Sequence, residues 1–202
     1  MNLAAVVAAA GLSRRMGREK ILLPLGASTI LETVLATLQS AGVQSIAAVI
    51  REDLPEAAER AAAAGALPVV NAAPGEEMLV SIRLGLAALG PDPDAVFVWP
   101  ADHPLVRVET VRMLAGRARV ARALIPLHRE RRGHPALVGR DLAREIERRD
   151  LPGGLRDLWR VRADAVDELE TGDPGVLFNV DTAEEYETAK RILAQEKKGR
   201  DR

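Results

Sequence analysis

A loop rich in small and cationic residues follows the first apolar run of the chain. The run over 3–8 is too short to span a membrane and is predicted to be a buried parallel strand. The small residues that come next let backbone N–H groups approach an anion closely, and arginine and lysine bring positive charge to the same place. The loop is therefore predicted to bind nucleotide phosphates, although it could also be an ordinary turn with solvated arginines. The residues assigned to this loop are Ala9, Ala10, Gly11, Ser13, Arg15 and Lys20.

The loop does not match either of the two commonest glycine-rich phosphate motifs. A P-loop needs a lysine followed by Ser or Thr, whereas Lys20 is followed by Ile21. A dinucleotide fingerprint needs closely spaced glycines and an acidic residue at the end of the next strand. Gly11 and Gly17 are too far apart, and Glu32 falls within a predicted helix. A nicotinamide-dependent reductase is therefore disfavoured.

Asp102 stands just after a predicted strand, at the edge of an open α/β sheet where ligands bind. The strand covers 95–99, and Pro100 and Pro104 stiffen the turn that presents the carboxylate. A carboxylate in this place suits Mg²⁺, a hard cation that prefers oxygen ligands and substrate phosphates. The alternative, a cap on the next helix, is disfavoured because that helix is predicted to begin only at Val108.

A second aspartate, Asp181, stands between a strand predicted at 176–180 and a helix predicted to begin at Ala183. Taken alone, Asp181 or Thr182 could equally cap that helix, with Glu184 or Glu185 completing a capping box. If both aspartates lie at one sheet edge and face the cationic glycine loop, they form a coherent site for a divalent ion and a nucleoside triphosphate.

These motifs resemble a known family. The pattern Ala-Ala-Gly-x-Ser-x-Arg-Met-Gly-x-x-Lys at 9–20, followed by Leu-Leu-Pro-Leu-Gly at 22–26, is similar to the signature of nucleotidyltransferases that activate small metabolites with an NTP. Within that superfamily the chain is most similar to the molybdenum-cofactor cytidylyltransferase branch, over nearly its whole length. The resemblance implies a Rossmann-like three-layer α/β/α fold with a mostly parallel central sheet, of the nucleotide-diphospho-sugar transferase type.

The resemblance also implies roles for individual residues. In this family the aspartate at the position of Asp102 holds the catalytic magnesium, and the one at the position of Asp181 completes the metal site. Gly75 and Ser81 match an element that contacts base and ribose, although Ser81 could instead be only a helix cap. The Ala-Ala-Gly opening at Ala9 favours cytosine over guanine, a feature that uridylyl enzymes share.

A basic segment in the second half of the chain is a candidate site for the acceptor of the nucleotidyl group. A phosphate monoester on a pterin needs cationic partners, although these arginines could also form a solvated turn. The run at 133–135 resembles the family's Gly-x-Pro acceptor loop and singles out His134. We do not expect His134 to act as a general base, because a phosphate nucleophile is already ionised at neutral pH. The residues concerned are Arg129, Arg131, Arg132, His134, Arg140 and Arg156.

Strand and helix patterns alternate along the chain, which is typical of an α/β protein with a largely parallel sheet. One domain is predicted over 1–196, with a disordered tail over 197–202. Ser28 is predicted to cap the first helix, which runs through 31–38. Later strands are predicted at 46–50, 67–70, 95–99, 122–127, 136–138 and 176–180, and helices at 55–64, 75–86, 108–119 and 183–194, with two more on either side of 150–154.

Composition narrows the functional class further. The 202 residues suit one domain with a substantial core. The chain has no cysteine, which excludes disulfides, thiolate metal sites and a cysteine nucleophile. A formal net charge of −1 favours neither nucleic acid nor a membrane surface as a partner. The first apolar run lacks the basic flank of a signal peptide, so a cytoplasmic enzyme is expected.

Together with the resemblance, these observations predict a nucleotidyltransferase that uses Mg²⁺, or alternatively Mn²⁺, and releases pyrophosphate. The resemblance implies CTP as the donor and molybdopterin as the phosphorylated acceptor of the CMP group. Arg15, Lys20 and Asp102 carry the predicted catalytic roles. A sugar, polyol or other small-metabolite phosphate is an alternative acceptor, and a non-catalytic carrier of nucleotide or cofactor is an alternative function. A molybdoenzyme or its chaperone would be the protein partner.

Overall fold

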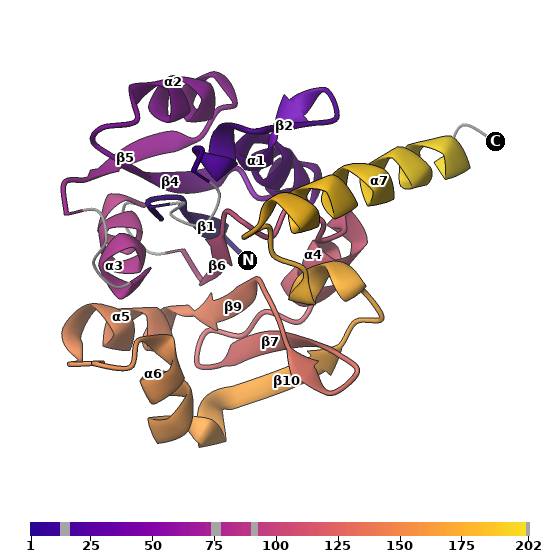
Figure 1. Ribbon diagram of the computed structural model, residues 1–202. Coiled ribbons are helices and arrows are strands. Elements are labelled where there is room, and N and C mark those ends of the chain that lie inside the picture. Colours follow the sequence, from indigo (N-terminus) through magenta and orange to yellow (C-terminus); the bar gives the residue numbers. More distant parts are fainter. Residues whose placement is uncertain (13–16, 74–77, 90–92, 201–202) are drawn as a thin grey trace.

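Strands and helices alternate along the chain, and Figure 1 shows them in sequence colours. This computed structural model describes residues 1–12, 17–73, 78–89 and 93–200, except for the side chains of 197–200. The strands are β1 (Leu3–Ala8), β2 (Pro24–Leu25), β3 (Ser28–Thr29), β4 (Ser45–Arg51), β5 (Leu67–Asn71), β6 (Ala95–Pro100), β7 (Ala123–His128), β8 (Arg131–Arg132), β9 (Ala136–Gly139) and β10 (Val166–Glu170). The helices are α1 (Ile30–Ser40), α2 (Pro55–Ala63), α3 (Met78–Ala88), α4 (Val108–Ala115), α5 (Arg140–Arg148), α6 (Leu155–Val161) and α7 (Ala183–Arg200), with the 3-10 turns η1 (Lys20–Leu22), η2 (Ala163–Ala165) and η3 (Pro174–Leu177).

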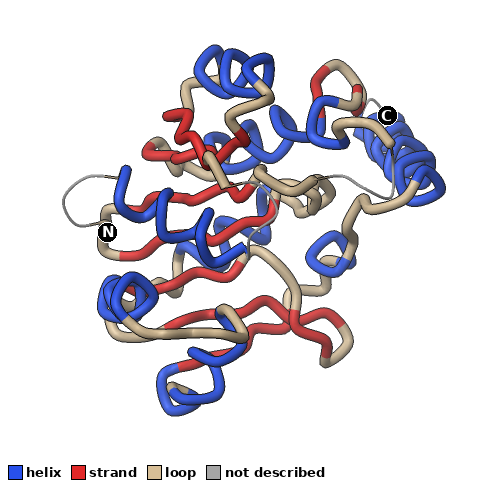
Figure 2. Tube along the Cα trace, turned by 60° about the vertical axis from the view of Figure 1, so that its left-hand side comes forward, coloured by secondary structure: helices blue, strands red, loops and turns tan. Residues whose placement is uncertain are grey.

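One mixed sheet forms the centre of the molecule, in the order β10-β7-β9-β6-β1-β4-β5. β9 runs antiparallel to both of its neighbours, and the other neighbours along this order are parallel, which confirms the predicted mostly parallel sheet. In Figure 2 the strands cross the molecule one below the other. Because β1 pairs in parallel with both β4 and β6, the carboxyl ends of these three strands lie at the same edge.

Helices cover both faces of the sheet. Alternate side chains of β1 point to opposite faces, so Ala5 and Val7 pack with α1, α2 and α4, whereas Ala4 and Val6 pack with α3. α5 and α6 cover the same face as α3 farther along the sheet, over β6, β7 and β9. This arrangement is the predicted three-layer α/β/α fold. The largest fully buried side chains are Trp99 and Phe97 of β6, and aliphatic residues make up most of the core.

The prediction of a strand at 176–180 is wrong. This segment contains the end of η3 and then irregular chain, and the edge strand is instead β10, which pairs in parallel with β7. β10 has the sequence Val-Asp-Glu-Leu-Glu, in which three of the five residues are acidic. It therefore lacks the continuous apolar run that marks a strand buried on both faces. Val176 and Val180 are buried, Val176 in the core cluster that also contains sheet residues and Val180 against α1 and α7, but neither lies in a strand.

Several helix ends also differ from the prediction. Thr29, and not Ser28, caps α1, because its hydroxyl accepts from the Glu32 N–H while the Glu32 carboxylate accepts from the Thr29 N–H. α4 ends before the predicted residue 119, and α7 continues past Ala194 to Arg200, into part of the predicted tail. Figure 1 shows α7 projecting beyond the other helices. None of the helices in the described chain combines the length and apolar character that a membrane span requires.

Candidate active site

The side chains of Asp102 and Asp181 meet at the ammonium group of Lys20. Lys20 Nζ donates to Asp102 Oδ2 at 2.7 Å and to Asp181 Oδ1 at 2.9 Å. All three side chains are largely buried, with 11%, 21% and 18% of their surface exposed for Lys20, Asp102 and Asp181. The fold thus brings together two carboxylates and one cation from three distant parts of the sequence.

Asp102 is held in place by the end of β6 and by its neighbours. The N–H of Ala101 donates to the carbonyl oxygen of Ala8 at 3.0 Å, which ties the turn after β6 to the end of β1. The carbonyl oxygen of Asp102 in turn accepts from the N–H of Val180 at 2.8 Å. This second bond brings the segment before Asp181 alongside, so the two aspartates are neighbours although 176–180 is not a strand.

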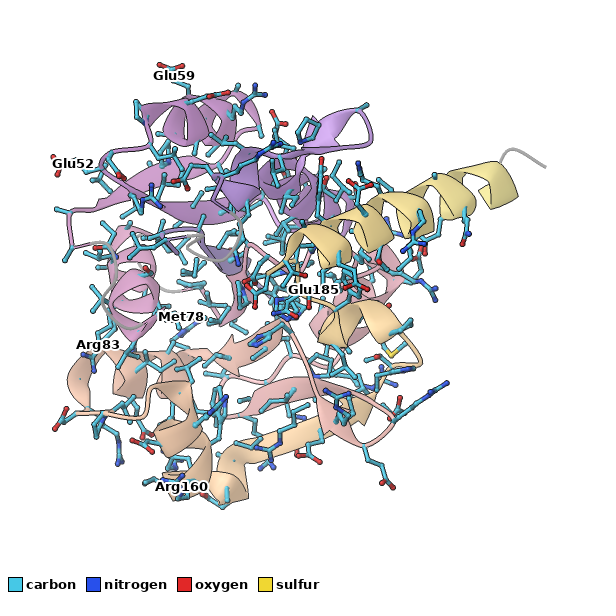
Figure 3. The ribbon with its side chains drawn as sticks, viewed as in Figure 1. Glu52, Glu59, Met78, Arg83, Arg160 and Glu185 are labelled. Carbon is cyan, nitrogen blue, oxygen red and sulfur yellow. The ribbon has the colours of Figure 1, made fainter. Side chains whose placement is uncertain are left out.

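Of the two residues predicted as possible caps of α7, Thr182 is the cap and Asp181 is not. Glu185 Oε2 accepts from the N–H groups of Asp181 and Thr182, each at 2.8 Å, and Thr182 Oγ1 accepts from the Glu185 N–H at 3.2 Å. Thr182 and Glu185 therefore cap the helix, and Figure 3 shows Glu185 where α7 begins, near the middle of the molecule. The Asp181 carboxylate instead contacts Lys20 and accepts from Asn179 Nδ2 at 2.7 Å.

The charges of this cluster stabilise one another. Burial by itself raises the pKa of Asp102, but a hydrogen bond from His103 and the charge of Lys20 outweigh it and hold the pKa well below its usual range. Burial by itself lowers the pKa of Lys20, but the two aspartates outweigh it and raise the pKa above its ordinary value. His103 Nδ1 lies 2.9 Å from Asp102 Oδ1, and the ionised carboxylate makes this nitrogen the donor. Both Lys20 and Asp102 are therefore ionised at neutral pH.

The donor set fits a magnesium or manganese ion. Asp102 and Asp181 offer carboxylate oxygens that already converge on one cation, the ammonium of Lys20. Within the described residues no group of three or more His, Cys, Asp or Glu side chains could form a closed metal cage. Mg²⁺ is commonly held by one or two carboxylates, with substrate phosphates and water supplying the other ligands. The residues therefore suit a metal that binds together with a polyphosphate.

A cavity of about 290 Å³ opens beside the charged cluster at the carboxyl ends of β1 and β6. The space beside the Gly11 backbone is open, because a Cβ atom added to this glycine would have no other atom within 4 Å. Packing does not demand glycine at this position, so its backbone is open to a ligand. The lining includes Ala9, Ala10, Gly11, Lys20, Asn71, Ser81 and Asp102.

Ser81 lies inside α3 and not at its cap, so the capping alternative is wrong. Its buried hydroxyl accepts from Asn71 Nδ2 at 3.2 Å and lines the cavity. Gly85, one turn later, lets α3 lie directly on β1, because a Cβ there would be 2.4 Å from Val6 Cγ1. The glycine of the Ser81–Gly85 motif therefore brings the serine close to the end of β1.

Three predicted site residues, Ser13, Arg15 and Gly75, lie outside the described residues. Their assigned roles in binding phosphate and base stay predictions.

A second and larger cavity, of about 1050 Å³, lies between α3, β9 and α6. Its floor is apolar, its rim carries arginines, and Met78 of α3, labelled in Figure 3, lines both cavities. Of the predicted acceptor residues, Arg132, His134 and Arg156 line it, and Arg129 and Arg131 are not in its described lining. Arg140 instead forms an ion pair with Asp94, just before the amino end of β6 and therefore at the opposite edge of the sheet. The prediction that Arg140 belongs to the acceptor site is therefore wrong.

His134 lines the larger cavity, and its ring contacts the ring of His103 edge-on, with 4.8 Å between the centroids. Its backbone N–H donates to the Val176 carbonyl oxygen at 2.8 Å. Gly133 permits this approach, because a Cβ there would be 2.4 Å from the Val176 oxygen. Burial, together with the nearby His103, lowers the pKa of His134 to about 4, so the ring is neutral at neutral pH.

We expect the low pKa of His134 to make the protein sensitive to acid. Between the ordinary histidine pKa of 6.5 and the folded value of about 4, the unfolded chain binds a proton that the folded chain does not. The free energy of unfolding therefore falls as the pH drops through this range. Urea unfolding at pH 7 and pH 4.5 should show wild type losing about 2 kcal/mol more than His134→Gln. Equal losses in the two proteins would contradict the buried, neutral state of this ring.

Several polar residues that no sequence motif marked also lie at the site. Asn71 contacts Ser81, Asn179 contacts Asp181, and Arg51 contacts the glycine loop. Arg51 and Asn71 are the last residues of β4 and β5. A polar residue that ends an apolar strand is the same signal that identified Asp102, so it could have identified these two as well.

Comparison with known proteins places the chain among nucleotidyltransferases. Residues 5–169 match the model of the MobA-like NTP transferase domain. The chain is 34% identical to a probable molybdenum cofactor guanylyltransferase of Mycobacterium avium, in an alignment of 203 residues that covers 96% of each protein. Over 187 residues it is 26% identical to the molybdenum cofactor cytidylyltransferase of Escherichia coli, with 92% of this chain and 94% of that protein covered. A solved nucleotidyl transferase from Methanothermobacter superposes with a TM-score of 0.82 at 26% identity, covering 96% of this chain and 98% of the other.

Proposed function

Because the chain belongs to the MobA-like NTP transferase family, we propose that this nucleotidyltransferase acts in molybdenum cofactor biosynthesis. It transfers a nucleotidyl group from an NTP to a phosphorylated acceptor of the molybdopterin type and releases pyrophosphate. The observation that carries the proposal is the meeting of Asp102 and Asp181 at Lys20, beside the cavity of the glycine loop.

The smaller cavity takes the NTP in this proposal. Its lining combines the small residues Ala9, Ala10 and Gly11, whose backbone groups suit phosphate oxygens, with the ammonium of Lys20. Asp102 and Asp181 would hold Mg²⁺ or Mn²⁺, which supplies charge neutralisation and a template for the phosphates. Arg15 is proposed to add a further positive charge.

The chemical step needs positioning and charge more than proton transfer. An oxygen of the acceptor phosphate attacks the α-phosphorus in line, the bond from that phosphorus to the bridging oxygen breaks, and pyrophosphate leaves. The attacking phosphate is already ionised, so no side chain has to remove a proton. Lys20 lines the cavity and offsets the negative charge that builds on the phosphoryl oxygens.

The larger cavity takes the acceptor. Its apolar floor includes Ile82, Val98 and Trp159, a surface that suits a flat heterocycle such as a pterin better than a sugar. Arg156 lines the same cavity and has no ion-pair partner in the part of the chain that the structure describes, which leaves its charge available to a phosphate. Since Met78 lines both cavities, a donor and an acceptor bound in them would be neighbours.

The donor proposed here is CTP. The Ala-Ala-Gly opening at Ala9 supports cytosine, and Asn71 and Ser81 provide an amide and a hydroxyl beside the cavity that can hydrogen-bond a base. GTP is the alternative donor, and the mycobacterial relative named as a guanylyltransferase favours it. Both donors use the same phosphate site and differ only in how the base is read.

Pyrophosphate release with each of the four NTPs, with and without molybdopterin and in Mg²⁺ or Mn²⁺, tests this proposal. We expect turnover only when molybdopterin is present and with CTP as the preferred donor. A preference for GTP would overturn only the assignment of the base. Turnover with a sugar or polyol phosphate would overturn the assignment of the acceptor. Tight nucleotide binding without pyrophosphate release in any combination would instead support a carrier.

Two variants should separate the donor cavity from the acceptor cavity. Ser81→Ala removes the hydroxyl beside the smaller cavity and should raise the KM for the NTP, while the KM for the acceptor stays near wild type. Arg156→Met removes a charge from the larger cavity and should raise the KM for the acceptor, while the KM for the NTP stays near wild type. Each effect should be about 10-fold, the size expected for losing one hydrogen bond to a charged or polar substrate group. Steady-state kinetics with each substrate varied in turn measures both, and a shift of both KM values by one variant would contradict the assignment.

A further inference from the structure

Arg51, the last residue of β4, is a buried arginine with only 6% of its surface exposed. Its guanidinium donates to both carboxylate oxygens of Glu19, at 2.7 and 3.1 Å, and to the carbonyl oxygen of Gly11 at 3.3 Å. It also donates to both carboxylate oxygens of Asp53, at 2.8 and 3.3 Å. Burying a guanidinium is costly unless its N–H groups find acceptors, and here they do.

Two of these partners belong to the glycine loop. Gly11 lines the smaller cavity near the start of the loop, and Glu19 directly precedes Lys20, the residue that contacts both aspartates. β4 lies beside β1, and the N–H of Ala9 donates to the carbonyl oxygen of Val49 at 2.8 Å. Arg51 therefore extends from a rigid neighbouring strand to two points of the chain that lie eight residues apart.

We propose that Arg51 is a positioning residue that holds Gly11 and Glu19 together and so sets the place of Lys20 before the NTP binds. The inference rests on the proposed binding of NTP in the smaller cavity. Arg51 is not in the described lining of that cavity, so it acts through the loop and not by contact with substrate. The planar guanidinium of Arg51 donates to Glu19 and Gly11 at the same time. A lysine ammonium in the same place could not bond both groups with this geometry.

The expected consequence is a cost in substrate binding. Glu19 directly precedes Lys20, so holding Glu19 in place leaves Lys20 less conformational freedom to lose when it contacts the phosphates, and the binding-competent state is populated in advance. Without the Arg51 guanidinium, the binding-competent state becomes a minor population. The apparent affinity for NTP then falls in proportion to the fraction of molecules in that state. Once NTP is bound the charged groups are in place, so the chemical step changes less.

The test compares Arg51→Met and Arg51→Lys with a matched control, Arg140→Met. Arg140 is also a partly buried arginine in an ion pair, with Asp94, but it lies at the opposite edge of the sheet. We expect both Arg51 variants to raise the KM for NTP by about 10- to 100-fold while kcat changes by less than about fivefold. The control should lower the melting temperature without moving the KM. If Arg51→Met does not fold, Arg51→Lys, which keeps the charge, carries the measurement.

Two further readouts make the result decisive. Hydrogen exchange in the peptides that contain Gly11 and Glu19 should speed up in the Arg51 variants and not in the control, and this needs no substrate. Glu19→Gln combined with Arg51→Met should raise the KM no more than Arg51→Met alone, because the two residues form one contact. Wild-type exchange in these peptides, additive KM effects, or an equal KM shift in Arg140→Met would each overturn the proposal. Failure of wild type to turn over NTP would instead overturn the proposed function, and the exchange measurement would still decide the role of Arg51.

Discussion

Replacing Lys20 with methionine should reduce the rate of pyrophosphate release by about 10³-fold or more at saturating NTP, with the fold retained. Lys20 lines the smaller cavity and is the cation that both aspartates contact, so the variant loses positive charge where negative charge builds in the transition state. Removing one preorganised group of this kind commonly costs 10²- to 10³-fold, and a full charge in a buried site should lie at the upper end of that range. Single-turnover kinetics, with circular dichroism as a check on folding, measures the effect.

The same variant should also change the response to metal. Without Lys20, the largely buried carboxylates of Asp102 and Asp181 lose the ammonium that contacts both of them, and the repulsion between their like charges is less well compensated. We therefore expect Mn²⁺ to raise the melting temperature of Lys20→Met more than that of wild type. Lys190→Met is the matched control, because Lys190 pairs with Glu187 on the exposed side of α7. Near-normal turnover in Lys20→Met, or identical metal responses in all three proteins, would contradict the assigned role.

Asp102→Asn and Asp181→Asn should each lower kcat by about 10²- to 10⁴-fold. The substitution keeps size and removes charge, so one of the two oxygen ligands that would hold the divalent ion is weakened while packing persists. Because both carboxylates serve one cation, the double variant should be hardly slower than the worse single variant. Pyrophosphate release over a range of Mg²⁺ concentrations, together with Mn²⁺ binding followed by electron paramagnetic resonance, measures both effects.

The control for the aspartate variants is Asp167→Asn on the edge strand β10. Asp167 also forms an ion pair, with Arg122, but it lies at the far edge of the sheet, away from both cavities. It should change neither kcat nor Mn²⁺ binding. If either active-site variant matched this control, the paired-carboxylate site would have to be abandoned.

Local sequence patterns predicted most of the fold for a physical reason. Apolar runs and helical periodicity report which residues are buried, and burial next to a turn determines most strand and helix ends. The predicted strands at 46–50, 67–70 and 95–99 match β4, β5 and β6 to within one residue at each end. The prediction at 176–180 fails for the same reason, because the valines there are buried without lying in a strand, whereas the acidic edge strand β10 carries only a weak apolar pattern.

By itself, the sequence determined the chemistry available at the site: a loop of small residues, a lysine, and aspartates that follow apolar segments. Strand order decided which of these groups meet, and local periodicity carries little information about strand order. Lys20 contacts residues 82 and 161 positions away because β1 and β6 pair in parallel and the Val180 N–H bonds to the carbonyl of Asp102. Only the tertiary structure could decide that Lys20 faces the carboxylates as well as the phosphate cavity, and that Arg51 bonds the glycine loop from the neighbouring strand. Such contacts depend on distances in space between groups that the chain itself keeps far apart.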